Sequence, residues 1–388
     1  MTKENKVPYT SADRLIDALN HREPQGIPFD LGGTKVTGIH INAYRRIMER
    51  LFGEAPKEVP LAHFTQQLAK IDDRLLSHFE VDTAGVFTST PAGKPPRKEQ
   101  DEDYLEYWDE WSIGWKMPQG HGLYYDMFYH PLVDGQDDLD SFPWPNGRDP
   151  VRFEGVKEEA LVAKEAGKAV TLGGICAGIF ELGLWLRGFE NFFTDLVLNP
   201  GMACGLMDRI LEVKMAYWDT VLDMIGDHVL VVQEADDLGT QTSSLISLEM
   251  YRKLIKPRHK RLFQFIKEKT SGKVKIFLHS CGNIAQFIPD FIDAGVDILN
   301  PVQTSTEEME PAKLKKAFGD AITFWGGGVD TQRILPYGSP EEVKDDVRRR
   351  IDDLAPGGGF VFATVHNIQA DVPPENIIAM VEALDEYR

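Results

Sequence analysis

Short apolar runs alternate with amphipathic stretches over most of this chain. From about residue 168 onward, six runs rich in β-branched and aromatic residues are separated by helix-like segments that end at proline or glycine. The runs are 169-AVTLGGI-175, 228-HVLVVQEA-235, 274-VKIFLHS-280, 296-VDILNPV-302, 321-AITFWGG-327 and 359-GFVFATV-365. The helix-like segments include residues 248–269, 284–295, 340–354 and 374–388. Strands that alternate with helices in this way predict a parallel sheet.

Two further candidate strands precede these six. They are 27-IPFDLGG-33, which the helical segment 41–53 follows, and 81-VDTAGVF-87. Eight strands alternating with helices are the number that closes a (β/α)₈ barrel, so the pattern predicts an α/β protein with a TIM barrel. We expect residues 1–388 to form a single domain of this kind.

An aromatic-rich insertion follows the second predicted strand, at about residues 100–150. It contains YLEYWDEWSIGWKM and GLYYDMFYHPL, a density of aromatic side chains that the rest of the sequence does not match. We interpret it as β-hairpins or a lid over the barrel mouth. A packed subdomain without a role in ligand binding is an equally good interpretation.

The charge balance excludes several classes of partner. The 42 basic and 61 acidic side chains give a formal charge of −19, which argues against binding to nucleic acids or to an anionic membrane. The N-terminal segment has no apolar signal core, and no apolar run is long enough to span a membrane. We therefore expect a cytoplasmic protein. Its three cysteines are too few and too widely spaced for a disulfide framework.

His279 and Cys281 are the first candidates for chemistry. Residues at positions i and i+2 of a strand point to the same side, and this pair lies where the fifth predicted strand ends. Barrel enzymes assemble their sites at the carboxyl ends of the strands. A thiolate and an imidazole that converge there suit Zn²⁺, which at a catalytic site has three protein ligands and one open position.

We predict His366 as the third ligand, because the eighth strand ends next to it and barrel closure makes distant strand ends neighbours. Polar residues at the same rim are candidates for other roles. We assign Glu234 and Asp236 to catalysis and Gln233, Asn300 and Gln303 to substrate binding.

A simpler interpretation remains open for the His279 and Cys281 pair, namely a half-buried histidine beside an inert core thiol. The other two cysteines fit such a description better. Cys176 lies in a glycine-rich turn and Cys204 in a predicted helix, so we expect both to be small buried hydrophobic residues.

Four segments together resemble one known family. They are 23-EPQGIPFDLGGT-34, 273-KVKIFLHSCGNI-284, 295-GVDILN-300 and 373-PPENIIAM-380. With the order of elements, they resemble the uroporphyrinogen decarboxylase superfamily over essentially the whole chain, most specifically from residue 273 to the C-terminus. The decarboxylases of that superfamily bind a tetra-anionic tetrapyrrole through arginines in the first strand-to-helix loop. Here that loop, residues 30–40, has Lys35 and no arginine, which disfavours decarboxylation.

The other branch of the superfamily comprises corrinoid-dependent methyltransferases. Their zinc is held by a His-x-Cys pair, matched here by His279 and Cys281, and by a third ligand shortly before a P-x-E-N-I segment. That third ligand is a cysteine in the methylcobamide:coenzyme M enzymes, whereas the matching residue here is His366. One thiolate fewer makes the metal a stronger Lewis acid and favours an oxygen ligand over a thiolate.

The resemblance therefore implies a zinc-dependent methyltransferase of the methoxyarene O-demethylase type. It would move a methyl group from a methoxylated aromatic to the cobalamin of a separate corrinoid protein. Three alternatives stay open: a methylcobamide:thiol methyltransferase, a uroporphyrinogen decarboxylase, and a metal-binding partner of a corrinoid complex without catalysis of its own. A homodimer is left open as the assembly state.

Overall fold

The computed structural model describes residues 8–89, 97–100, 103–133 and 138–388 of the chain. Residues 1–7 of the N-terminal segment, and parts of the predicted insertion, lie outside the described residues. Within the described part, no helix is long and apolar enough to cross a membrane.

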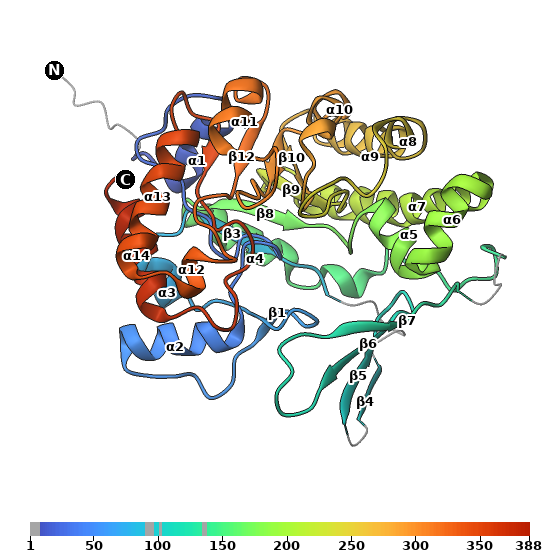
Figure 1. Cartoon of the computed structure of the whole chain (residues 1–388), viewed down its shortest axis with the longest axis horizontal. Coiled ribbons are helices and arrows are strands. Elements are labelled where there is room, and N and C mark those ends of the chain that lie inside the picture. Colours follow the sequence, from blue (N-terminus) through green and yellow to red (C-terminus); the bar gives the residue numbers. More distant parts are fainter. Residues whose placement is uncertain (1–7, 90–96, 101–102, 134–137) are drawn as a thin grey trace.

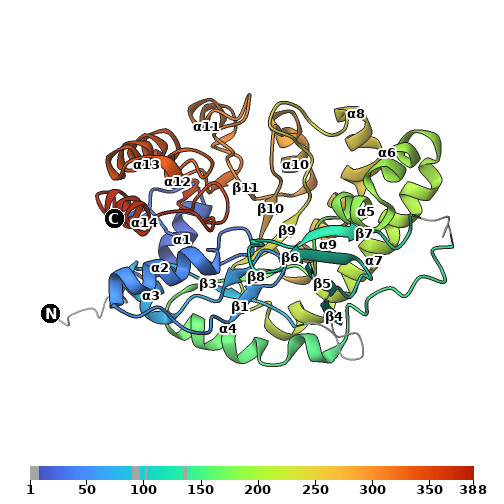
Figure 2. The ribbon, with the colours of Figure 1, turned by 60° about the horizontal axis from the view of Figure 1, so that its bottom comes forward.

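Seven parallel strands form one curled sheet in the order β13-β12-β11-β10-β9-β8-β3 (Figures 1 and 2). They are β3 (Thr83–Val86), β8 (Ala169–Gly173), β9 (Val231–Ala235), β10 (Lys275–His279), β11 (Ile298–Asn300), β12 (Thr323–Trp325) and β13 (Phe360–Val361). Within this sheet the strands pair in their order along the chain, as the alternation with helices predicts. All seven lie within the predicted runs.

The first predicted strand is shorter than expected, but it closes the sheet. Phe29 forms an isolated parallel bridge with Phe362, and the Asp30 N–H donates to the Phe362 carbonyl at 2.8 Å. On the other side, the Asp82 N–H donates to the Phe29 carbonyl at 2.9 Å. The segment around Phe29 therefore lies between β13 and β3 and completes the predicted eight-unit barrel.

The barrel has two apolar layers, because side chains of a strand alternate between its two faces. One layer fills the barrel interior and includes Val231, Phe277 and Trp325, with Leu15 and Leu19 of α1 (Ser11–Leu19) covering its lower end. The other layer packs the outer faces of the strands against the surrounding helices. The upper end of the interior, where the strands terminate, remains for polar residues.

Thirteen further α-helices occur in the described residues. They are α2 (Ile41–Phe52), α3 (Asp73–His78), α4 (Val156–Glu165), α5 (Ile179–Arg187), α6 (Phe189–Leu198), α7 (Pro200–Ile225), α8 (Leu248–Met250), α9 (Lys256–Lys269), α10 (Ile288–Ala294), α11 (Pro311–Phe318), α12 (Ile334–Tyr337), α13 (Pro340–Leu354) and α14 (Pro374–Asp385). Short 3₁₀ turns cover Pro150–Phe153 and Ala285–Phe287.

The helix predicted over residues 248–269 is not a regular α-helix throughout. It contains a π-helical stretch, Tyr251–Ile255, between α8 and α9. Pro257 directly follows the first residue of α9 and has no N–H to donate to the preceding turn. The loss of that hydrogen bond favours a wider turn at this point.

The insertion after the second barrel strand forms a separate antiparallel sheet. Its strands are β4 (Arg97–Gln100), β5 (Tyr104–Trp108), β6 (Gly114–Pro118) and β7 (Asp126–Tyr129). It lies beside the barrel together with a small hairpin of β1 (Leu61–His63) and β2 (Leu68–Ala69) (Figures 1 and 2). The predicted β-hairpin character of the insertion is confirmed.

Candidate metal centre

His279 and Cys281 point into the upper end of the barrel. His279 is the last residue of β10 and shares the inward face with Phe277, two positions earlier. The backbone of Cys281 is held in place because its N–H donates to Asp237 Oδ1 at 2.8 Å. The next residue, Gly282, has a φ of +89°, and its N–H donates to Gln303 Oε1 at 2.7 Å. The turn after Cys281 thus depends on glycine.

Three potential metal ligands converge at this point. Ligand atoms of His279, Cys281 and His366 all lie within 4.8 Å of one another, and Cys281 Sγ is 3.3 Å from His279 Nε2. In a tetrahedral zinc site the ligand atoms are about 3.4 to 3.6 Å apart. A thiolate and two imidazoles at this spacing fit Zn²⁺ after shifts of about an ångström. The structure therefore brings together the three ligands predicted from distant strand ends.

Asn300 sets the orientation of the His279 ring. Asn300, the last residue of β11, lies 2.5 Å from His279 Nδ1 through its side-chain oxygen. The Asn300 amide nitrogen donates to the Trp325 carbonyl at 2.7 Å, which fixes the oxygen toward the ring. His279 Nδ1 must then carry the proton, and Nε2 is left with a lone pair directed at the cluster.

The surroundings of His366 and Cys281 favour the uncharged form of both side chains. Burial lowers the pKa of the His366 imidazole to about 3, and the neighbouring His279 acts in the same direction. Burial also raises the pKa of the Cys281 thiol well above its ordinary value, with Asp237 and Glu181 adding to the effect. Both shifts arise because this site disfavours net charge. A bound divalent cation would offset the cost of forming the thiolate.

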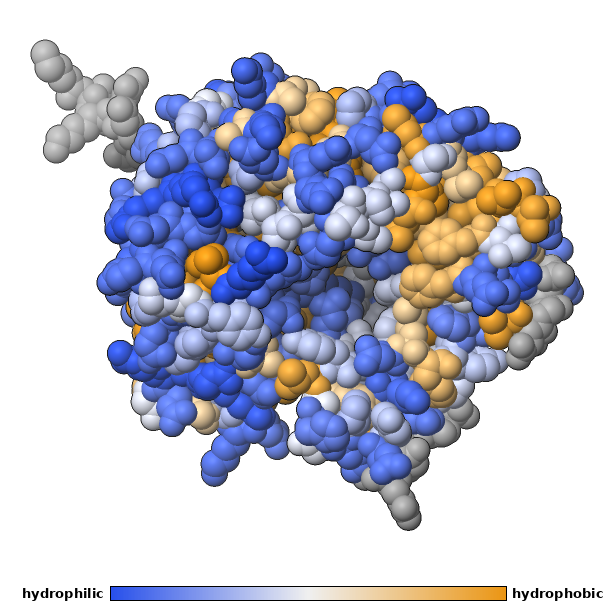
Figure 3. All heavy atoms as spheres, viewed as in Figure 1, coloured by the Kyte–Doolittle hydropathy of each residue, from blue (hydrophilic) through white to orange (hydrophobic). Residues whose placement is uncertain are grey.

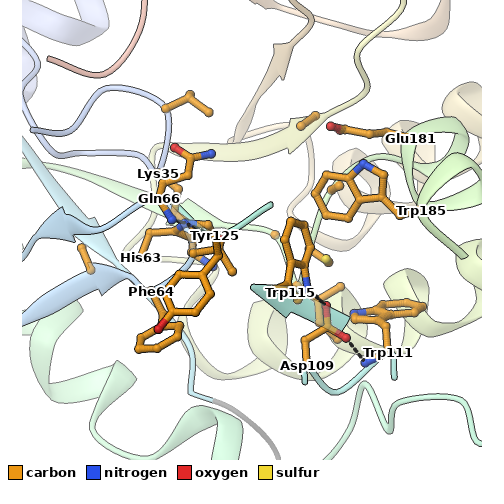
Figure 4. A pocket seen from close by; sticks show the side chains of 18 of the residues that line it. Lys35, His63, Phe64, Gln66, Asp109, Trp111, Trp115, Tyr125, Glu181 and Trp185 are labelled. Carbon is orange, nitrogen blue, oxygen red and sulfur yellow. Dashed lines mark hydrogen bonds between the residues drawn. The ribbon is translucent and has the colours of Figure 1, made fainter. Parts of the chain in front are cut away.

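A cavity of about 690 Å³ opens above the cluster and includes His279 and His366 in its walls. Its aromatic lining comes mostly from the insertion and from α5, and consists of Phe64, Tyr107, Trp111, Trp115, Tyr124, Tyr125 and Trp185. The rings of Trp115 and Trp185 meet edge to face, with centroids 5.3 Å apart. Figure 4 shows Trp115 and Trp185 on one side of the cavity and Phe64 and Tyr125 on the other.

The insertion therefore lines the cavity rather than forming a remote subdomain. Figure 3 shows the molecular face of Figure 1 hollowed near its middle, with hydrophobic residues gathered beside the hollow over α5 and α6. A space of this size accommodates a small molecule with one or two rings.

Glu234 and Asp236 face away from this cavity. Glu234 is 3% exposed, and its carboxylate accepts hydrogen bonds from Lys214 Nζ (2.7 Å) and Trp218 Nε1 (2.6 Å) of α7. Asp236 is fully buried and accepts from the N–H groups of Phe180 and Glu181 at the start of α5. It also contacts His259 Nε2 at 2.8 Å. Both carboxylates anchor helices to the barrel.

The residues assigned to substrate binding have three different surroundings. Gln233 lines the cavity, and its buried Oε1 has no hydrogen-bond partner in the described part of the chain. Asn300 is buried and contacts His279 Nδ1. Gln303 accepts a hydrogen bond from the Gly282 N–H in the turn after Cys281. Cys176 is partly buried and packs against the hydrophobic core, as expected, and it also lines the cavity. Burial raises the pKa of its thiol to about 12.

Several polar residues of the cavity were not among the predicted site residues. Glu181 and Asp237 line it near the cluster, and Lys35 and His63 line it elsewhere. Burial, together with the negative charge of Asp237, raises the pKa of Glu181 well above its ordinary value. The sequence places Asp237 at the strand-end rim without assigning it a role, and its strand parity, the same as that of Gln233, directs it toward the cavity. The sequence carried no comparable signal for Glu181 or His63.

Comparisons with known proteins place the chain in a family. The family model described as uroporphyrinogen decarboxylase (URO-D) matches residues 127–387. A uroporphyrinogen decarboxylase of Alkalilimnicola ehrlichii is 21% identical over 381 residues, covering 96% of this chain and 93% of that protein. A methylated-thiol–coenzyme M methyltransferase of Methanosarcina mazei is 25% identical over 248 residues, covering 63% of this chain and 61% of that protein.

The fold is shared with a solved structure described as a methyltransferase from Methanosarcina mazei. The two superpose with a TM-score of 0.66 at 18% identity, covering 98% of this chain and 99% of that one. Relatives thus include both decarboxylases and methyltransferases. Because the family model matches more than half of its residues, this chain belongs to the uroporphyrinogen decarboxylase family.

Proposed function

We propose that this protein is a zinc-dependent methyltransferase that removes the methyl group from a methoxylated aromatic compound. The methyl acceptor is cob(I)alamin carried by a separate corrinoid protein. One observation carries the proposal: the His279, Cys281 and His366 cluster lies at a cavity whose lining includes seven Phe, Tyr and Trp side chains. The methyltransferases among the relatives support the reaction type.

In this reaction the methyl group leaves the ether oxygen as the O–C bond breaks, and the electron pair of cob(I)alamin forms the new C–Co bond. The ether oxygen keeps the electrons of the broken bond as a phenolate and takes up one proton. Zn²⁺ held by the three ligands would act as a Lewis acid that stabilises the negative charge developing on this oxygen.

The chain's own residues provide position and a proton. Trp115 and Trp185 offer ring faces and edges for an aromatic substrate. Glu181 faces the cavity, where burial raises its pKa and favours the protonated carboxyl group, which would donate the proton to the phenolate. In the proposal Glu181 takes the role that the sequence suggested for Glu234 or Asp236, since those two carboxylates have helix-anchoring partners.

Transfer of a methyl group to or from a thiol is the second candidate, because one of the relatives is a methylated-thiol–coenzyme M methyltransferase. The two reactions need the same cluster. They differ in the group that occupies the open ligand position, an ether oxygen or a thiolate.

Decarboxylation of a tetrapyrrole is less well supported by the cavity. Four carboxyl groups line it, those of Asp109, Glu110, Glu181 and Asp237. Of the two basic side chains among the lining residues, Arg152 pairs with Glu110 in a buried ion pair. That leaves Lys35 alone to meet a tetra-anionic substrate.

The test combines metal analysis with turnover. Purified protein should contain about one zinc, and a Cys281→Ser His279→Ala double variant should contain none. Cys204→Ser is the matched control, because Cys204 lies on α7 outside the cavity lining. With free cob(I)alamin as acceptor, a panel of methoxyarenes should yield phenols and methylcobalamin in the wild type and the control only.

Each alternative has its own outcome in this test. Methylation of added thiols by methylcobalamin, without phenol release from any ether, would favour the thiol reaction. Zinc binding without turnover on ethers or thiols would favour a non-catalytic partner. Equal and near-zero zinc in wild type and double variant would remove the basis of the proposal.

A further inference from the structure

Lys35 is a cation in the cavity without a counter-ion. It lies in the loop after the Phe29 segment and lines the cavity on the same side as His63 and Gln66 (Figure 4). Within the described ranges, no carboxylate pairs with Lys35, and its ammonium group makes no hydrogen bond. Burial lowers the pKa of Lys35, so an anion placed beside it would stabilise the charged ammonium form.

Three of the four carboxyl groups of the cavity have other partners, and the fourth, Glu181, makes no ion pair with Lys35 in the described part of the chain. Glu110 forms its ion pair with Arg152. Asp109 accepts from Trp115 Nε1 and from the Trp111 N–H, both at 2.9 Å. As described above, Asp237 holds the Cys281 backbone. The charge of Lys35 is therefore available to a ligand.

His63 supplies a second donor next to Lys35. The Gln66 N–H donates to His63 Nδ1 at 3.3 Å, which places the proton of the neutral ring on Nε2. Burial and the nearby charge of Lys35 lower the pKa of His63 to about 3, so the ring stays neutral. An ammonium group and an imidazole N–H on one wall form a site for a small anion.

Asn367 holds this site and the metal centre in one rigid unit. Its amide nitrogen donates to the Lys35 carbonyl (3.1 Å) and to Gln66 Oε1 (2.7 Å), and its oxygen accepts from the Gly38 N–H (2.6 Å). Asn367 is 1% exposed and directly follows the candidate ligand His366. The distance between cation and cluster is thereby constrained.

We propose that the substrate is a methyl aryl ether that carries a carboxylate on its ring. The carboxylate binds Lys35 Nζ and His63 Nε2–H, the ring packs against the aromatic walls, and the ether oxygen lies toward His279 and His366. Because Lys35 is one unpaired cation among several carboxyl groups, the cavity favours a substrate with one negative charge over a substrate with several. The ether part of this inference rests on the proposed function, whereas the carboxylate part rests on the contacts described above.

Binding to the purified protein tests the carboxylate site without any turnover. The probes are 4-methoxybenzoate and its uncharged methyl ester, titrated by calorimetry or by quenching of tryptophan fluorescence. Wild-type protein should bind the carboxylate about 10- to 100-fold more tightly than the ester, as expected for a charged hydrogen bond in a buried site. Lys35→Met should abolish this preference and leave ester binding unchanged.

Two further variants complete the design. Lys35→Arg keeps the charge and should retain at least part of the preference. Lys70→Met is the matched control, because Lys70 is 64% exposed, pairs with Glu159 and does not line the cavity. It should behave as wild type.

Three results would overturn the inference: binding of neither probe, equal binding of both, or a preference that survives in Lys35→Met. Its failure is distinguishable from failure of the proposed function. Selective binding that depends on Lys35, without methyl transfer to cob(I)alamin, would leave the carboxylate site in place and refute the demethylase. Methyl transfer from neutral ethers with no preference for carboxylates would support the demethylase and refute the carboxylate site.

Discussion

The orientation of His279 by Asn300 can be tested with a substitution of similar size, Asn300→Leu. Leucine removes the acceptor that lies 2.5 Å from His279 Nδ1 and the donor to the Trp325 carbonyl. The imidazole can then rotate or adopt the other tautomer. Loss of such an orienting partner typically reduces metal affinity about 10- to 100-fold, which corresponds to about 1.4 to 2.7 kcal/mol.

The same substitution also removes two buried hydrogen bonds, so a loss of stability is expected in addition. At about 1 kcal/mol for each bond, the free energy of unfolding should fall by about 2 kcal/mol. Asn376→Leu is the matched control for this effect. Asn376 is 2% exposed and donates to the Leu335 and Gly338 carbonyls, both at 2.8 Å. It lies outside the candidate metal centre.

Zinc affinity is measured by competition with a chelating dye, and stability by urea unfolding of the same metal-free samples. Asn300→Leu should lose both zinc affinity and stability, whereas Asn376→Leu should lose stability alone. Asn300→Asp keeps an acceptor for His279 Nδ1–H and should restore most of the affinity. If Asn300→Leu binds zinc within about twofold of wild type, the orientation argument is refuted.

Three other substitutions test separate features. Asp236→Ala removes the acceptor for two N–H groups of α5 and should cost about 3 kcal/mol of stability in urea unfolding, with zinc content unchanged; a loss of zinc at full stability would contradict the anchoring role. Gly282→Ala would bring a Cβ to 2.3 Å from the Gly239 backbone at a φ of +89°, so it should lower both the melting temperature and zinc affinity. An unchanged melting temperature would show that the turn tolerates a side chain. Burial raises the pKa of Asp109 to about 6, so folded protein binds a proton there that the unfolded chain releases, and this contribution to stability is lost as the pH rises from about 4 to 6. Asp109→Asn lacks this proton, so the decrease in the free energy of unfolding between pH 4 and 6 should be smaller than in wild type by about 2 to 3 kcal/mol. Urea unfolding at several pH values measures this, and the same pH dependence in both proteins would contradict the prediction.

The sequence was most informative where a periodic signal existed. Apolar runs predicted all seven strands of the sheet, and the convergence of His279 and Cys281 followed from the two-residue repeat of a strand. The same repeat separates Gln233, which faces the cavity, from Glu234 and Asp236, whose hydrogen-bond partners lie on helices. Assigning all three to the cavity overlooked this alternation.

Other parts of the site had no such signal. Glu181 and Trp185 belong to a helix that is buried on several sides, so apolar periodicity does not tell which of its residues face a cavity. His63 lies in a short hairpin outside the barrel repeat, and its position beside Lys35 depends on packing between segments distant in sequence. Only the folded chain brings these side chains together.

The short bridge between Phe29 and Phe362 has a consequence for how the chain folds during synthesis. The seven strands of the barrel sheet pair in the order in which they leave the ribosome, but the bridge joins the two ends of that series. Until residue 362 has emerged, the nascent sheet keeps two open edges on which other chains could assemble. The few residues around Phe29 and Phe362 thus protect both edges of the sheet. The nascent chain should bind chaperones most strongly just before these two segments pair.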